Sequence, residues 1–199
     1  MNRAHIEVSQ RKGAPMKPST FRLLALSLSL LTVGAVAKTK TAPGASSSLA
    51  AEMLTAHNQA RSKANPTPAP ALPPLTWSPE AAKVAQAYAN QCKFEHNRSR
   101  DKKFGENLAA AAPPGSKTNA QVVEDWMSEM ADYAYATNKC APGKVCGHYT
   151  QVVWRNTTHV GCATALCTKN SPFGAQFPTW QLWVCNYTPP GNFVGQKPY

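Results

Sequence analysis

In the stretch GHYTQVVWRNTTHVGC, residues 147–162, a histidine precedes an apolar run. His148 stands at the head of this run, two residues after Cys146. A run that faces a hydrophobic core has no need of a side chain that titrates near neutral pH. His148 is therefore a candidate for one of four roles: a helix cap, a catalytic base, a metal ligand or a hydrogen-bonded core residue.

The residues that follow this run predict two strands. TTHVGCATAL (157–166) and FPTWQLWVCNY (177–187) are rich in β-branched and aromatic residues, and a loop with glycine and proline separates them. The segment HYTQVVW (148–154) fits either a short helix or a strand, because seven residues are too few for periodicity to decide.

Helices are predicted earlier in the chain. The apolar spacing from Leu49 to about Lys63 is helical, and the proline-rich segment 65–74 ends that helix. In WSPEAAKVAQAYANQC (77–92), serine is an N-cap candidate and the proline after it suits the first helical turn. Thr118 and Gln121 form a capping-box pair that opens a third helix, and GENLAAAA (105–112) is short enough to be a strand or an extended segment. Helices before and between short strands indicate an α+β domain or a layered α/β/α domain.

Glu129 falls on the apolar stripe of the third helix, beside Trp126 and Met130. A carboxylate on a core-facing side is costly unless it is hydrogen-bonded, paired or bound to a metal. Glu129 therefore either swings into solvent at a frayed helix end or has a partner in the core.

The N-terminal region has the three parts of a signal peptide. A basic start is followed by the apolar segment 23–33 and by Ala35-Val36-Ala37, a small-x-small cleavage site. We expect residues 1–37 to be this peptide, with Met16 as an alternative start, and the protein to be secreted. Residues 38–48 are predicted to be a flexible lead-in, and residues 49–199 a single domain that folds as a monomer.

The charge of the expected mature chain is positive. Removing the five basic residues and one acidic residue of positions 1–37 from totals of 21 and 10 leaves 16 and 9, a net charge of +7. That charge favours anionic surfaces such as membrane headgroups or acidic polysaccharide. The one loose basic cluster, Arg98, Arg100, Lys102 and Lys103, is most simply a solvated face, and a specific nucleic-acid site is not expected.

All six cysteines lie after the cleavage site. An even number in an exported chain predicts three disulfides, for which the sequence alone allows fifteen pairings. Zinc bound by cysteines is disfavoured because no CxxC pair occurs.

The absence of characteristic motifs argues against several enzyme classes. The sequence has no GxSxG elbow, no HExxH helix and no glycine-rich phosphate loop. The side chains with unusual placement are His96, Glu106, Glu129 and His148. They are spread along the chain with no local metal-binding motif, so spacing alone does not show that they form a cluster.

Four segments together resemble the CAP superfamily, which comprises cysteine-rich secretory, antigen 5 and pathogenesis-related proteins. HNQAR (57–61), GENLA (105–109), GHYTQVVWRNT (147–157) and CNYTPPGNF (185–193) are similar to motifs of that family, and the ending PPGNFVGQKPY is closest to the pathogenesis-related branch. The resemblance implies an α/β/α sandwich with a small central antiparallel sheet flanked by helices. It also implies the disulfides Cys92–Cys167, Cys140–Cys146 and Cys162–Cys185.

The resemblance further implies a central cleft lined by His96, Glu106, Glu129 and His148. Two imidazoles with one or two carboxylates suit a divalent ion such as zinc, with water completing an open site. They equally suit a hydrogen-bond network without metal.

Three functions follow from the resemblance. The favoured one is a secreted, non-enzymatic binding module of the defence type, which acts on a lipid, a sterol or an anionic membrane through the aromatic residues Tyr133 and Tyr135. The second is a zinc-dependent hydrolase in which Glu106 or Glu129 is the base. The third is a precursor of a C-terminal signalling peptide, residues 189–199.

Overall fold

The computed structural model describes residues 45–199. The expected signal peptide, 1–37, therefore lies outside the described residues, and so does the expected lead-in up to residue 44. The first helix begins at Ala45, within that lead-in, rather than at Leu49. Alanine and serine are compatible with a helix there, although their composition is also that of a linker.

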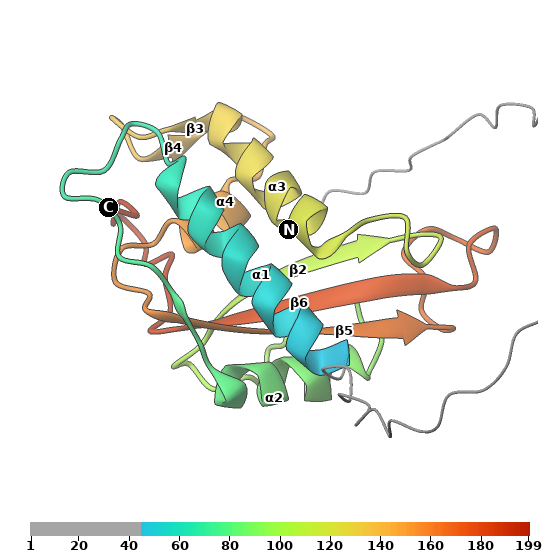
Figure 1. The fold of residues 1–199 in the computed structure, drawn as a ribbon. Helices are drawn as coiled ribbons and strands as arrows, with labels where there is room; N and C mark the ends of the chain where they lie inside the picture. The colour runs from blue at the N-terminus through green and yellow to red at the C-terminus, as the bar shows by residue number, and fades with distance from the viewer. Residues whose placement is uncertain (1–44) are drawn as a thin grey trace, which may run out of the picture.

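The described chain is built from short helices and strands (Figure 1). In chain order these are α1 (Ala45–Ser62), β1 (Thr76–Trp77), α2 (Pro79–Ala89), β2 (Gly105–Ala111), α3 (Asn119–Ser128), the 3₁₀ helix η1 (Glu129–Asp132), β3 (Tyr133–Ala134), β4 (Lys139–Cys140), α4 (Gly147–Val152), β5 (His159–Cys167) and β6 (Trp180–Thr188). Most of the segment 148–154, which periodicity left open, thus lies in α4, the short helix that the resemblance implies.

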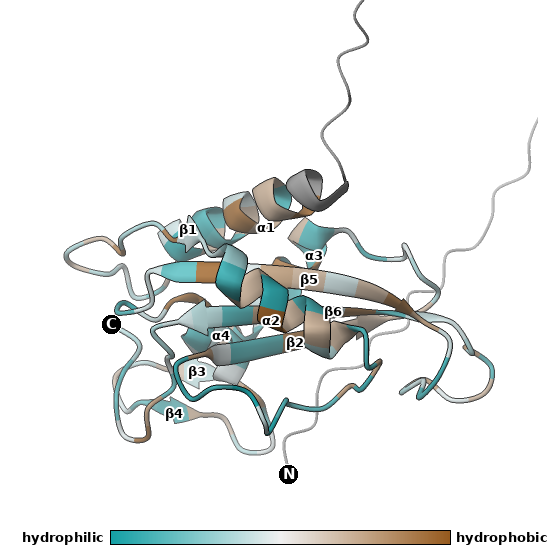
Figure 2. Ribbon diagram, turned by 90° about the horizontal axis from the view of Figure 1, so that it is seen from below, coloured by the Kyte–Doolittle hydropathy of each residue, from teal (hydrophilic) through white to brown (hydrophobic). Residues whose placement is uncertain are grey.

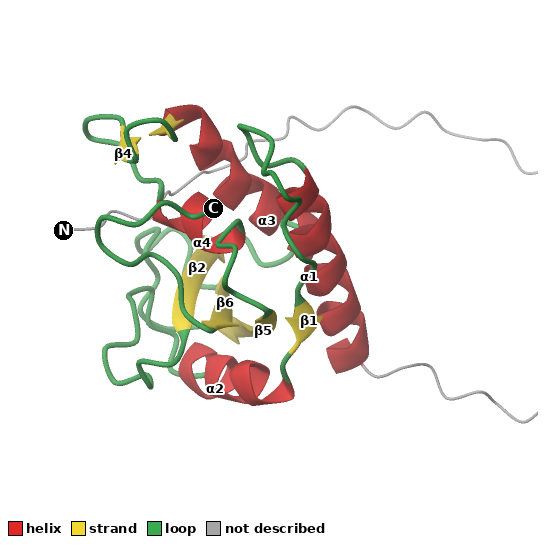
Figure 3. Cartoon of the chain, turned by 90° about the vertical axis from the view of Figure 1, so that its left-hand side faces the viewer, coloured by secondary structure: helices red, strands yellow, loops and turns green. Residues whose placement is uncertain are grey.

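The predicted layered fold is confirmed. One four-stranded sheet has the order β1-β5-β6-β2, with α2 on one face and α1, α3 and α4 on the other (Figures 1 and 3). Figure 2 views the molecule from the α2 side, where that helix lies over β5 and β6. The three long strands are antiparallel, but the two-residue β1 pairs in parallel with β5, so the sheet is mixed.

Two helix starts form as the sequence predicts. The Ser78 side chain accepts a hydrogen bond from the Ala81 N–H, and Pro79 occupies the first turn of α2. At α3 both halves of the capping box are present, between Thr118 and Gln121. These caps satisfy backbone N–H groups that a helix leaves without intrahelical partners.

The six cysteines form three disulfides, in the pairs that the resemblance implies: Cys92–Cys167, Cys140–Cys146 and Cys162–Cys185. The last joins directly opposite residues of β5 and β6. Between residues 45 and 199, the helices are too short or too polar to span a bilayer.

The sheet and α2 approach each other closely at Gly161. The Ser78 N–H donates to the Val160 carbonyl at 2.9 Å, and the buried Asn186 side chain donates to the Ala81 carbonyl at 3.4 Å. A Cβ atom added at Gly161 would lie 2.2 Å from the Ala82 nitrogen and 2.4 Å from the Ser78 oxygen. Backbone atoms cannot swing aside as a flexible side chain does.

We therefore expect Gly161→Ala to push α2 from the sheet and to lower the free energy of unfolding by about 1–3 kcal/mol. Denaturant unfolding with the disulfides intact measures this loss. Gly147→Ala is the matched control, because the nearest atom to its added Cβ is 3.8 Å away. Equal stability of the two variants would contradict this account of the α2 contact.

Candidate functional site

The start of α4 is built around the carboxylate of Glu129. Its Oε2 accepts hydrogen bonds from the backbone N–H groups of His148 at 2.9 Å and Tyr149 at 3.1 Å. Its Oε1 lies 2.6 Å from the His148 Nδ1, which is therefore the protonated ring nitrogen. Cys146, the residue before α4, provides no side-chain cap, so a carboxylate from η1 takes over that task.

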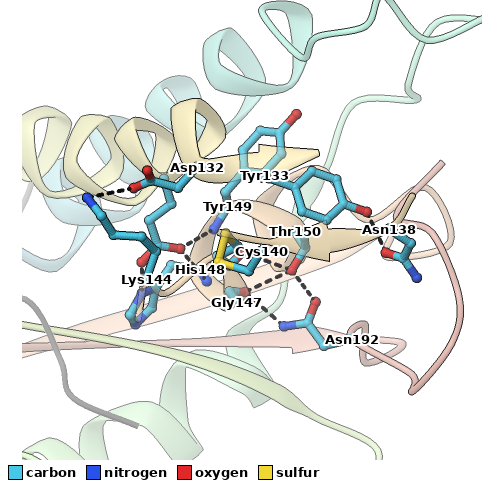
Figure 4. The surroundings of a disulfide bond; sticks show 12 residues. Asp132, Tyr133, Asn138, Cys140, Lys144, Gly147, His148, Tyr149, Thr150 and Asn192 are labelled. Carbon is cyan, nitrogen blue, oxygen red and sulfur yellow. Dashed lines mark hydrogen bonds and ion pairs between the residues drawn. A yellow bond between two sulfur atoms is a disulfide. The ribbon is translucent and has the colours of Figure 1, made fainter. Parts of the chain in front are cut away.

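The surroundings hold this pair in place. The ring of Trp126 stacks on the His148 ring, with centroids 6.1 Å apart, and Glu129 is buried. The Cys140–Cys146 disulfide lies beside the start of α4, where the Asn192 amide donates to the Gly147 carbonyl at 2.8 Å (Figure 4). His148 thus belongs to the constrained first turn of helix α4 rather than to a mobile loop.

A second histidine–carboxylate pair joins β2, which carries Glu106, to the preceding loop, which carries His96. The Glu106 Oε1 is 2.8 Å from the His96 Nδ1 and accepts the Asn97 N–H at 2.9 Å. The Glu106 side chain is fully buried, whereas that of His96 is 44% exposed. Oε2 of Glu106 is buried without a hydrogen-bond partner among residues 45–199. The guanidinium of Arg100 lies 3.7 Å from Oε1.

The two pairs share one pattern. In each, a buried glutamate engages the Nδ1 of a histidine, and no hydrogen bond of Nε2 occurs within the described part of the chain. The pairs are also linked, because Asn107 follows Glu106 in β2 and its amide donates to the His148 carbonyl at 3.1 Å. The structure therefore brings the four predicted residues together as two pairs.

Those four residues do not place three or more ligand atoms within 4.8 Å of one another. Among residues 45–199, the one such group of histidine, cysteine or acidic residues is His57, Cys162 and Cys185. It does not suit a metal, because both sulfurs are in a disulfide and metals bind the thiolate. Both ring nitrogens of His57 are also occupied by other partners.

His57 belongs to a buried hydrogen-bond relay. Its Nδ1 donates to the Met53 carbonyl at 2.7 Å, so its Nε2 accepts from the Tyr187 hydroxyl at 2.8 Å. That hydroxyl accepts in turn from the Asn107 amide at 3.2 Å, which leads back to His148. Burial lowers the pKa of His57 to about 4, and burial raises that of Tyr187 well above its usual value.

Sequence reasoning did not single out Asn107 or Tyr187, although both lie inside the quoted motifs GENLA and CNYTPPGNF. Their position inside these motifs was the one feature of the sequence that could have marked them as functional residues. Their partners come from other elements, so spacing within the motifs carries no information about them.

Tyr133 and Tyr135, the expected lipid-binding residues, are half-buried. The Tyr133 hydroxyl donates to Asn138 Oδ1 at 2.6 Å, as Figure 4 shows. The Tyr135 hydroxyl donates to the Tyr199 carbonyl, and those two rings stack with centroids 4.7 Å apart. Both tyrosines thus contact residues of their own chain.

The model of the cysteine-rich secretory protein family, CAP, matches residues 54–187. The chain belongs to this family. A pathogenesis-related protein of the PR-1 type from Sambucus nigra is 44% identical to this family member over 152 residues, which are 74% of the chain and 80% of the relative. Peptidase inhibitor 16 of Homo sapiens is 40% identical over 74% of the chain, but the match spans only 31% of that human protein.

Solved structures of the family are similar as well. NaASP2 with Zn²⁺ superposes with a TM-score of 0.58 at 26% identity, over 79% of this chain and 88% of that one. Together with the family match, this superposition confirms the fold, and the identity to the PR-1-type protein shows the kinship with pathogenesis-related proteins.

Proposed function

We propose that this CAP protein is a secreted, non-enzymatic binding module of the defence type, and that His96 and His148 bind a divalent metal ion such as zinc. Secretion is supported by the three disulfides, which form and persist in oxidising compartments. The kinship with a PR-1-type protein supports a role in defence.

One observation carries the metal proposal: in both pairs the glutamate holds Nδ1 and leaves Nε2 available. A metal-binding histidine characteristically donates its other ring N–H to a carboxylate, which fixes the tautomer and raises the basicity of the ligand. In this proposal the Nε2 atoms of His96 and His148 are the protein ligands, with water completing the coordination. Glu106 and Glu129 orient the rings, and the zinc in the similar NaASP2 structure supports the choice of ion.

The hydrolase alternative is less well supported. A general base must reach the water from which it takes a proton. Glu129 has both oxygens engaged, one by His148 Nδ1 and the other by two backbone N–H groups. Glu106 is fully buried and holds His96. Neither carboxylate is presented to a solvent-filled site.

A lipid, a sterol or an anionic membrane remains the proposed target. Tyr133 and Tyr135 are adjacent aromatic side chains, and the Lys197 ammonium lies 4.7 Å from the centre of the Tyr135 ring. Binding through these rings requires displacement of Tyr199. Release of the peptide 189–199 requires the same displacement, and it also breaks the 2.7 Å hydrogen bond from the Arg155 N–H to the Pro198 carbonyl.

We expect the purified protein to bind zinc in calorimetry and the double variant His96→Ala, His148→Ala to lose that binding. Glu129→Gln should weaken it by about 10- to 100-fold, because it removes the carboxylate that orients His148. His159→Ala is the matched control, since that histidine is exposed and lies on β5. A wild-type protein that binds no zinc, or a control that loses as much affinity as the double variant, would refute the metal proposal.

A further inference from the structure

The basic loop 98–103 forms one side of a cavity with a volume of about 340 Å³. Arg98, Arg100 and Lys102 line it, and the segment Pro190–Phe193 contributes its other side through Pro190, Gly191 and Phe193. Such a volume is at the small end of ligand-binding cavities. The charge that looked like a solvated face in the sequence is therefore gathered around a hollow.

The cations of this loop differ in their partners. Lys103 does not line the cavity, and its charge is shared with Glu80 at 2.8 Å and Asp101 at 3.6 Å. Arg98 and Lys102 have no acidic partner within 4.0 Å in the described part of the chain. Two uncompensated positive charges thus remain at the cavity, which attracts an anion.

Arg100, which also lines the cavity, is held in a fixed position. Its Nε donates to the Phe104 carbonyl and its NH1 to the Asn97 carbonyl, both at 3.0 Å. These bonds set the guanidinium in the cavity wall before any ligand arrives, so little side-chain freedom is lost on binding.

The opposite wall is equally well fixed. A Cβ atom at Gly191 would lie 2.6 Å from the Trp154 ring, so the backbone packs directly on that buried side chain. The Gly191 N–H donates to the Gln151 Oε1 at 3.0 Å. Phe193 lies 6.0 Å from Trp154 between ring centroids and is still 50% exposed. A large apolar ring is therefore held at the cavity with half of its surface open.

Positive charges next to an open aromatic ring match one ligand chemistry particularly well. The C–H faces of a sugar pack on the electron-rich face of an aromatic ring, while carboxylates on the same sugar pair with arginine and lysine. We propose that this cavity binds an acidic oligosaccharide, with uronate carboxylates on Arg98 and Lys102 and a sugar face on Phe193. A phosphate or a lipid headgroup would use the cations but not the ring.

The test is binding of an oligogalacturonate of about ten sugars to the purified protein, by calorimetry with a chelator present. The chelator removes metal from the proposed zinc site and leaves this cavity unaffected, because the residues of that site do not line it: His96, Glu106, Glu129 and His148. We expect binding that weakens as salt rises. The affinity should fall at least about tenfold in the double variant Arg98→Gln, Lys102→Gln and also in the single variant Phe193→Ala. The fully methyl-esterified oligosaccharide, which lacks the carboxylates, should not bind.

The matched control is Lys83→Gln, Lys169→Gln, which removes the same charge from exposed residues outside this cavity. If the control loses as much affinity as the cavity variants, the attraction is unspecific and the proposal is overturned. It is also overturned if Phe193→Ala binds normally, or if inorganic phosphate or phosphatidylserine vesicles compete equally well for the site. All the substituted side chains are exposed, and thermal unfolding of each variant verifies that it is folded.

Discussion

Replacing Arg61 with methionine is expected to lower the free energy of unfolding by about 3–5 kcal/mol. Arg61 is 2% exposed. Its guanidinium makes four hydrogen bonds, to the carbonyls of Pro73, Val152 and Trp154. It therefore ties the end of α1 to the proline-rich loop and to the end of α4. Burial lowers its pKa to about 10, so it still carries its charge at neutral pH.

Methionine fills a similar volume but leaves three carbonyl groups without their donor. Denaturant unfolding should show a lower midpoint with an unchanged slope. Arg61→Lys is the informative companion, because it keeps the charge but loses the planar fork that reaches three carbonyls. Its free energy of unfolding should lie between those of the wild type and Arg61→Met. If methionine cost less than lysine, the stabilising role assigned to these bonds would be wrong.

Acidification is expected to destabilise the protein through His57. In the folded protein its pKa is about 4 because burial disfavours the charged ring, whereas its ordinary value is 6.5. Below pH 6.5 the unfolded chain takes up a proton that the folded protein refuses until about pH 4. Stability therefore rises with pH across this window, and about 3 kcal/mol is lost on going down through it.

The measurement is the free energy of unfolding at several values between pH 4 and pH 7. His57→Gln should be less stable at neutral pH, because Met53 or Tyr187 loses a partner, yet its stability should fall less steeply with acid. His159→Gln, which removes an exposed histidine, should keep the wild-type slope. Parallel curves for wild type and His57→Gln would show that His57 does not set this dependence.

Local patterns in the sequence predicted the elements well where the cause is local. The Ser78 cap, the capping box of Thr118 and Gln121 and the strands β5 and β6 follow from residues that are neighbours in the chain. The start of α1 was predicted four residues late, because Ala45–Ser48 has the composition of a linker and its helical state depends on continuation of the helix.

The site could be predicted only in part. The stripe of α3 marked Glu129 as a carboxylate that needs a partner. The actual partners are two backbone N–H groups and a ring nitrogen nineteen or twenty residues further on, which no periodicity encodes. The cavity beside Phe193 likewise joins two segments that lie some ninety residues apart. The sequence showed the basic cluster of residues 98–103, but not that Phe193 lies on the other side of the same cavity.

The burial of Asn186 has a consequence for production of the protein. Asn186-Tyr187-Thr188 is an acceptor sequence for N-linked glycans, but this asparagine is 1% exposed and donates to the Ala81 carbonyl beneath α2. A glycan attached there would occupy the place of that helix. In a host that glycosylates nascent chains, modification at Asn186 and closure of α2 over the sheet exclude each other, and every correctly folded molecule carries Asn186 unmodified.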